Sequence, residues 1–86
     1  MGNIHTSGED YLETILVLWN KQNGEVRSID VARELNVTKP SVSNAMKILR
    51  EGKFITMDEN GFITLTDAGR YVAVSYTHLR AHETKA

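Results

Sequence analysis

Two short amphipathic segments separated by only three residues restrict the possible folds of this chain more than any other feature. Residues 28–35 and residues 39–51 both repeat apolar side chains at helical spacing, and the turn between them, residues 36–38, is short and mostly polar. The apolar stripe of the second segment consists of Val42, Ala45, Met46 and Leu49. Two helices joined in this way predict a helix-turn-helix.

Residues with strong positional preferences predict where both helices begin and end. Ser28 is a candidate N-cap for the first helix, and Thr38 is a candidate N-cap for the second. Pro40 falls in the first turn of the second helix, where its missing N–H removes no helical hydrogen bond. Gly52 is a natural place for that helix to end.

A longer amphipathic helix precedes the pair. Helical spacing predicts it over residues 7–21, with Ser7 as its N-cap and Asn23-Gly24 as its end. Its apolar face is broad and consists of Tyr11, Leu12, Ile15, Leu16, Leu18 and Trp19. We therefore expect three helices to share one core.

A hairpin and a last helix follow the pair. Residues 54–57 and 62–65 are predicted strands, and the Asn-Gly within the connection 58–61 is a strong hairpin signal. Thr66 can cap a final helix that includes Val72 and Ala73. The predicted fold is α+β but mainly α: a winged helix-turn-helix, in which a three-helix bundle is followed by a two-stranded wing and a C-terminal helix. We expect residues 1–73 to form this single domain, because 86 residues allow one core only.

Positive charge is concentrated in the middle of the chain. The formal net charge is −1, but it is −3 over residues 1–26, +3 over residues 27–53 and −1 over residues 54–86. The predicted helix-turn-helix thus carries the localised positive charge that binding to DNA phosphates requires. The wing tip, residues 58–61, is acidic, so we expect the wing to contribute packing more than affinity.

The polar side of the 39–51 helix has the residue types that read a DNA major groove. The predicted DNA-binding residues are Thr38, Lys39, Pro40, Ser41, Ser43, Asn44, Lys47 and Arg50. Asn44 can bond adenine through two hydrogen bonds, the serines can reach bases or phosphates, and the basic side chains suit phosphates. A solvated face of a structural helix would carry similar residues. The combination with the turn, the hairpin and the localised charge favours double-stranded DNA as the partner.

Four stretches of the chain resemble one known family. They are Ser7–Ile15, Val31–Val37, Pro40–Ser43 and Leu65–Arg70. They are similar to the iron- and manganese-dependent repressors, the family of the diphtheria toxin repressor and the manganese transport regulator, over about residues 7–73. The resemblance implies a cytoplasmic, homodimeric transcriptional repressor that binds operator DNA when it is loaded with Mn²⁺ or Fe²⁺.

The same resemblance implies metal ligands in the first helix. Asp10 and Glu13 match the two first-helix ligand positions of the manganese-type members. Because they are three residues apart, they share a helix face with Val17, away from the apolar stripe. Their hard oxygens suit Mn²⁺ or Fe²⁺. The alternative is that they are first-turn carboxylates that only interact with the helix dipole.

The end of the chain departs from the family pattern. Where the family has a further ligand histidine in its last helix, this chain has Arg80. Residues 74–86 resemble read-through of a cloning adaptor, and we interpret them as a candidate non-native tail. His78 and His82 have a spacing that can bind metal, but a foreign tail is the better interpretation. We expect the metal-binding and dimerisation domain to be absent and the metal site to be incomplete.

Several classes of protein are excluded. The chain has no cysteine, and its longest apolar run, residues 15–19, is far too short to span a membrane. The sequence contains no glycine-rich phosphate loop and no Ser/His/acid set at motif spacing, so no catalytic motif indicates an enzyme. Two alternatives stay open. One is a winged helix that binds DNA without responding to metal, and the other is a winged helix that binds another protein.

Overall fold

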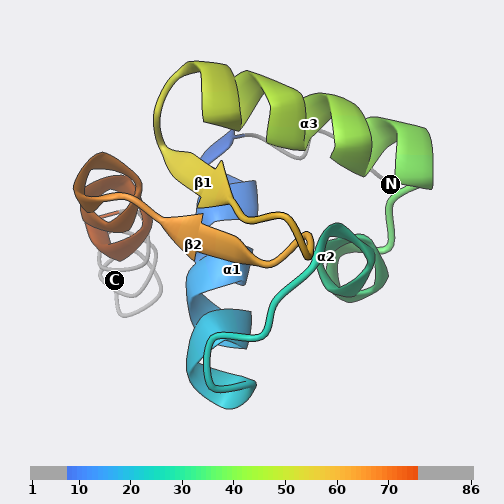
Figure 1. Cartoon of the computed structure of the whole chain (residues 1–86), viewed down its shortest axis with the longest axis horizontal. Coiled ribbons are helices and arrows are strands. Elements are labelled where there is room, and N and C mark those ends of the chain that lie inside the picture. Colours follow the sequence, from blue (N-terminus) through green and yellow to red (C-terminus); the bar gives the residue numbers. More distant parts are fainter. Residues whose placement is uncertain (1–7, 76–86) are drawn as a thin grey trace, which may run out of the picture.

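The three predicted helices and the hairpin are present in the computed structural model, which describes residues 8–75. The elements in chain order are α1 (Gly8–Lys21), α2 (Ser28–Leu35), α3 (Lys39–Glu51), β1 (Ile55–Met57) and β2 (Ile63–Leu65). A C-terminal helix begins at residue 67 and is followed to residue 75. In Figure 1, α3 crosses one end of α1, and the hairpin lies between α2 and the C-terminal helix. This arrangement confirms the predicted winged helix-turn-helix.

The core lies where the apolar face of α1 meets α2, α3 and the hairpin. Ile15, Val31 and Ile63 come from three different elements and have no exposed surface. The buried core consists of Tyr11, Leu12, Ile15, Leu18, Val26, Val31, Ala32, Val42, Met46, Leu49, Ile55, Ile63, Leu65 and Ala73. Burial of one large apolar side chain stabilises a fold by about 1.5–3 kcal/mol, so this shared core holds the helices and the wing together. Among residues 8–75, no helix has both the length and the apolar character needed to cross a bilayer.

The wing is a short antiparallel hairpin that is tied to the helices. Ile55 pairs with Leu65, and Met57 pairs with Ile63. Each strand has three residues, one fewer than predicted. The N–H of Ile63 also donates to the carbonyl of Val26 at 2.8 Å. The connection between α1 and α2 therefore supports the outer side of β2.

The turn at the wing tip is stabilised by one carboxylate. Asp58 Oδ1 accepts hydrogen bonds from the N–H groups of Asn60 and Phe62, both at 2.9 Å. Gly61 has a φ of +86°, which glycine adopts without steric cost. The predicted Asn-Gly hairpin signal is thus accounted for by the backbone geometry of the turn.

The N-terminal cap of α3 is as predicted, and that of α2 is not. Thr38 Oγ1 accepts a hydrogen bond from the N–H of Ser41 at 3.2 Å, which confirms it as the cap of α3. Ser28 is already the first residue of α2, and the capping position belongs to Arg27. There the carboxylate of Asp30 reaches back and accepts from the Arg27 N–H at 2.9 Å. The prediction for Ser28 was wrong because the carboxylate three residues into the helix already satisfies this N-terminus.

The end of α3 is as predicted, since the helix ends at Glu51 and Gly52 is its C-cap. The φ of Gly52 is −80°, and Lys53 adopts the left-handed conformation with φ +65°. A Cβ at Gly52 would lie 2.9 Å from the ring of Phe54, so a larger residue there would require this ring to move. Ser7, the predicted cap of the first helix, lies outside the described residues.

The C-terminal helix is attached to the end of α3 at two points. Thr66 Oγ1 accepts from the N–H of Gly69 at 3.1 Å, which confirms Thr66 as a cap, and it donates to the Lys53 carbonyl at 2.7 Å. Gly69 packs so closely on the Phe54 carbonyl that a Cβ at this position would overlap the carbonyl oxygen. This helix therefore cannot shift without moving the segment that leaves α3.

Candidate nucleic-acid interface

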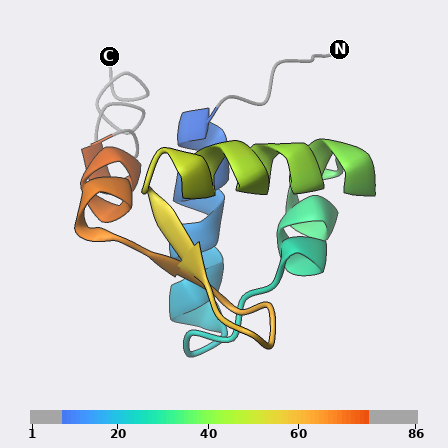
Figure 2. The same ribbon diagram turned by 45° about the horizontal axis from the view of Figure 1, so that its top comes forward.

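The polar side of α3 is exposed along its whole length, and no other described element covers it (Figure 2). All the residues predicted to bind DNA are exposed: Thr38, Lys39, Pro40, Ser41, Ser43, Asn44, Lys47 and Arg50. We call these residues the outer face of α3. The opposite side buries Val42, Met46 and Leu49 against the rest of the core. The helix therefore has one exposed polar side and one buried apolar side, as predicted.

The two hydroxyl groups at the start of α3 are coupled. Besides accepting from the Ser41 N–H, Thr38 Oγ1 donates to Ser41 Oγ at 2.9 Å. Ser41 Oγ therefore keeps its own hydrogen for donation to another group. The remaining N–H groups of this first turn give the helix a positive end, and Lys39 lies beside them. This tip can bind an anionic group such as a phosphate.

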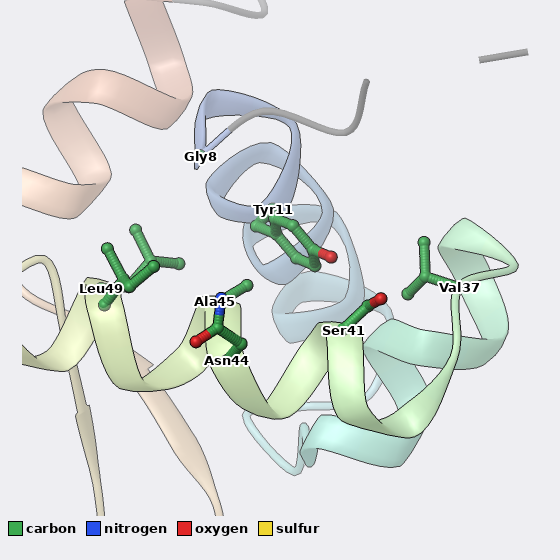
Figure 3. A pocket seen from close by; sticks show the side chains of 8 residues that line it. Gly8, Tyr11, Val37, Ser41, Asn44, Ala45 and Leu49 are labelled. Atoms are coloured by element: carbon green, nitrogen blue, oxygen red, sulfur yellow. The ribbon is translucent and has the colours of Figure 1, made fainter. Parts of the chain in front are cut away.

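One flank of the outer face borders a hollow. A cavity of about 410 Å³ lies between α3 and the N-terminal end of α1. Ser41 and Asn44 line it from α3, and Tyr11 faces it from α1 (Figure 3). The remaining lining residues are Gly8, Val37, Ala45, Ile48 and Leu49. Burial raises the pKa of the Tyr11 phenol above its ordinary value of 10.0, so this wall of the hollow is uncharged at neutral pH.

The other flank borders the wing. Arg50 Nη1 lies 4.0 Å from the sulfur of Met57, the last residue of β1. The predicted set is therefore one continuous surface in which Asn44 and Arg50 lie toward opposite flanks. Asn44 lies on the side of α1, and Arg50 lies on the side of the hairpin.

The basic residues of the middle third do not all belong to this surface. The Arg27 guanidinium carbon lies 4.5 Å above the centre of the ring of Phe62, which directly follows the turn at the wing tip. Arg33 forms an ion pair with Asp30 at 3.7 Å, one turn earlier on α2. Charge counting along the sequence cannot separate these arginines from Lys39 and Lys47, because the separation depends on where the helices point.

One exposed residue of α3 was missed in the sequence prediction. Ile48 is 57% exposed and lines the hollow together with Ser41 and Asn44. It was left out because it is apolar. Its spacing, seven residues after Ser41 and four after Asn44, is the signal that places it on the same flank.

The predicted metal ligands lie on the outer side of α1. Asp10 and Glu13 are half-buried, and Val17, one turn further, is 44% exposed. This agrees with a face that points away from Leu12 and Ile15 in the core. Within residues 8–75, no group of three or more His, Cys, Asp or Glu side chains could hold a metal ion. The described residues thus offer two hard oxygen donors on one face and no complete ligand set.

Arg80, His78 and His82 lie outside the described residues. The interpretation of these residues as part of a non-native tail therefore stays a prediction.

Comparison with known proteins places this architecture among transcription regulators. The model of a family described as iron dependent repressor, N-terminal DNA binding domain, matches residues 3–63. No curated protein sequence matches the chain. The solved structure of ScaR with bound Zn²⁺ is 24% identical, with a TM-score of 0.71 over 83% of this chain and 32% of ScaR.

Two further solved structures share the fold. The DNA complex of MepR, a transcription regulator from Staphylococcus aureus, is 25% identical, with a TM-score of 0.68 over 88% of this chain and 58% of MepR. The zinc-dependent MarR family transcriptional regulator AdcR, in its Zn(II)-bound state, is 25% identical, with a TM-score of 0.64 over 95% of this chain and 57% of AdcR. The chain thus spans about a third of ScaR and less than two thirds of MepR and AdcR. The family and these structures are regulators and not enzymes.

Proposed function

Since this chain belongs to the iron dependent repressor family and has its N-terminal DNA-binding domain, we propose that it binds operator DNA sequence-specifically through the outer face of α3. The observation that carries the proposal is that every predicted contact residue is exposed on one uncovered side of this helix. A major groove about 12 Å wide admits such a helix, and the polar side chains can then meet base edges.

The residues of the outer face divide into base-reading and phosphate-binding groups. Asn44, near the middle of the helix, is the candidate for two hydrogen bonds to an adenine. Ser41 and Ser43 can donate to bases or phosphates from either side of it. The phosphate contacts fall to Lys39, Lys47 and Arg50, with Thr38 and Pro40 shaping the tip that enters the groove. Because its tip is acidic, the wing would contribute packing more than affinity for DNA.

The proposal extends to a metal response through α1. Asp10 and Glu13 would hold part of the coordination shell of Mn²⁺ or Fe²⁺, because carboxylate oxygens suit these ions. When bound, the ion would supply positive charge that links α1 to the rest of its ligands. ScaR and AdcR are described with bound zinc, which supports metal sensing as a class without naming the metal for this chain. Two carboxylates alone predict weak affinity.

We further propose residues 1–73 as the DNA-binding unit of a cytoplasmic homodimer. Dimers of helix-turn-helix proteins gain affinity from two half-sites one helical turn apart. The rest of the metal site and the dimerisation function would then belong to a part of the regulator other than this unit. For the single unit we expect weak and strongly salt-dependent binding to DNA.

The test is selection of short DNA duplexes at low salt, with and without Mn²⁺. The purified chain should enrich a defined sequence, and Asn44→Ala should weaken binding to that sequence without changing the melting temperature. If Mn²⁺ raises the affinity and Asp10→Ala abolishes the rise, α1 carries the metal response. An affinity that Mn²⁺ leaves unchanged would instead favour a DNA-binding domain without a metal response. If no duplex binds even at low salt, DNA binding is wrong for this chain, and a protein-interaction module becomes the better assignment.

A further inference from the structure

Ile48 is an apolar residue on an otherwise polar surface. Within the described part of the chain, the large exposed apolar residues are Val17, Ile29, Ile48, Tyr71 and Val74, and Ile48 alone of these belongs to α3. It is more exposed than Val17 or Ile29. The core does not need Ile48, because the buried side of α3 is already formed by Val42, Met46 and Leu49.

The position of Ile48 relative to Asn44 is fixed by the helix. Residues four apart lie on the same side, so Ile48 lies one turn further along α3, about 6 Å from Asn44 along the axis. Both line the hollow between α3 and the start of α1, together with Ser41. The hollow leaves open space beside both residues; Figure 3 shows this for Asn44.

We propose that Ile48 recognises the 5-methyl group of a thymine in the major groove. This inference rests on the proposed function, in which α3 enters that groove. Among the base edges of the major groove, the thymine methyl is the apolar group, and apolar side chains read it by contact. Base pairs stack about 3.4 Å apart, so a side chain one helical turn from Asn44 reaches a base pair within about two steps of the one that Asn44 reads.

The proposal assigns a chemical preference to the operator. Asn44 favours an adenine, and Ile48 favours a thymine close to it, so each half-site should contain a short A·T-rich step beneath this part of α3. The isoleucine carries no charge and makes no phosphate contact. Its effect should therefore fall on sequence preference and leave the salt dependence of binding unchanged.

The test uses the duplex that the wild-type chain selects, with each thymine replaced in turn by deoxyuridine. This replacement removes only the methyl group. Loss of one buried methyl should weaken wild-type binding about four-fold at one thymine near the preferred adenine. In Ile48→Ala, binding to the unmodified duplex should be weaker, and the same deoxyuridine replacement should have no further effect. Val17→Ala is the matched control, because it shortens an exposed apolar residue of α1 and should keep the full deoxyuridine effect.

Two kinds of failure can be distinguished. If the wild-type chain selects a duplex but no deoxyuridine replacement weakens binding, or if Ile48→Ala keeps the effect, the role of Ile48 is wrong and DNA binding stands. If Ile48→Ala changes only the sedimentation of the chain, Ile48 contacts a second copy, and the thymine assignment is overturned. If the wild-type chain binds no duplex at low salt, the proposed function and this inference fail together. Because Ile48 is exposed, its variant should melt like the wild type, which a thermal unfolding scan checks.

Discussion

At the scale of single residues, two glycines illustrate two different requirements for the absence of a side chain. Gly61 has open space around it and is needed for its φ of +86°. Gly69 lies in a helix, where any residue fits the backbone, and is needed because Phe54 approaches it. The residue type alone does not distinguish these two requirements. The first is predictable from the Asn-Gly pattern, but the second depends on a contact between distant segments.

Gly69→Ala should therefore destabilise the fold, although alanine favours helices. A Cβ at this position would overlap the Phe54 carbonyl oxygen. Because this oxygen belongs to the backbone, it cannot move aside as a side chain could. We expect the free energy of unfolding to fall by about 2 kcal/mol, because overpacking typically destabilises a fold by more than the higher helix propensity of alanine stabilises it. Urea unfolding measures the change, with Ala68→Gly as the control on the exposed side of the same helix. A Gly69→Ala variant as stable as the wild type would show that the two backbone segments can move apart at little cost in free energy.

The locations of Ile48 and Arg27 differ from those that their residue types alone would suggest. An isoleucine in an amphipathic helix is normally assigned to the core, yet Ile48 is largely exposed. An arginine near a basic helix is normally assigned to DNA, yet Arg27 stacks on Phe62. For Ile48, the spacing from Ser41 and Asn44 is a local signal of its side of the helix. For Arg27, no local pattern in the sequence encodes the contact, because it depends on how the helices and the wing are arranged.

At the scale of elements, the prediction was most accurate where local signals set the structure. The bounds of α2 and α3 are as predicted, because apolar spacing and the Thr38 cap act within one turn. The one error in these bounds is equally local. The carboxylate of Asp30, and not the side chain of Ser28, forms the hydrogen bond at the start of α2. The error concerns which of several neighbouring residues satisfies the same backbone groups.

The wing turn offers a test that separates geometry from charge. Asp58→Ala removes the acceptor of two backbone hydrogen bonds, and we expect a loss of about 1 kcal/mol of unfolding free energy. Asp58→Asn keeps an oxygen in the same place and should remain close to wild-type stability. Urea unfolding of both variants measures the difference. Equal losses in the two variants would assign the effect to the negative charge and not to the hydrogen bonds.

At the scale of the whole molecule, the charge distribution sets how binding responds to salt. The outer face of α3 presents Lys39, Lys47 and Arg50, while Arg27 is directed to the wing. If these three side chains each neutralise one phosphate, the logarithm of the binding constant should fall with the logarithm of salt concentration with a slope of about −3. Lys47→Ala should reduce the steepness by about one unit.

The control for this measurement is Arg27→Ala. It removes the same charge from a residue stacked on Phe62, so the slope should stay near that of the wild type. Titrations at several salt concentrations on one duplex give all three slopes. A slope that falls equally in both variants would mean that binding depends on net charge and not on the outer face of α3.

The attachment of the C-terminal helix to the end of α3 has a mechanical consequence. Two hydrogen bonds from Thr66, to the carbonyls of Lys53 and Phe54, and one close backbone contact at Gly69 join the start of the C-terminal helix to the segment that leaves α3. We therefore expect a rotation of the C-terminal helix to move the end of α3 with it. If α3 binds DNA as proposed, its tilt in the groove and the direction of the C-terminal helix should change together.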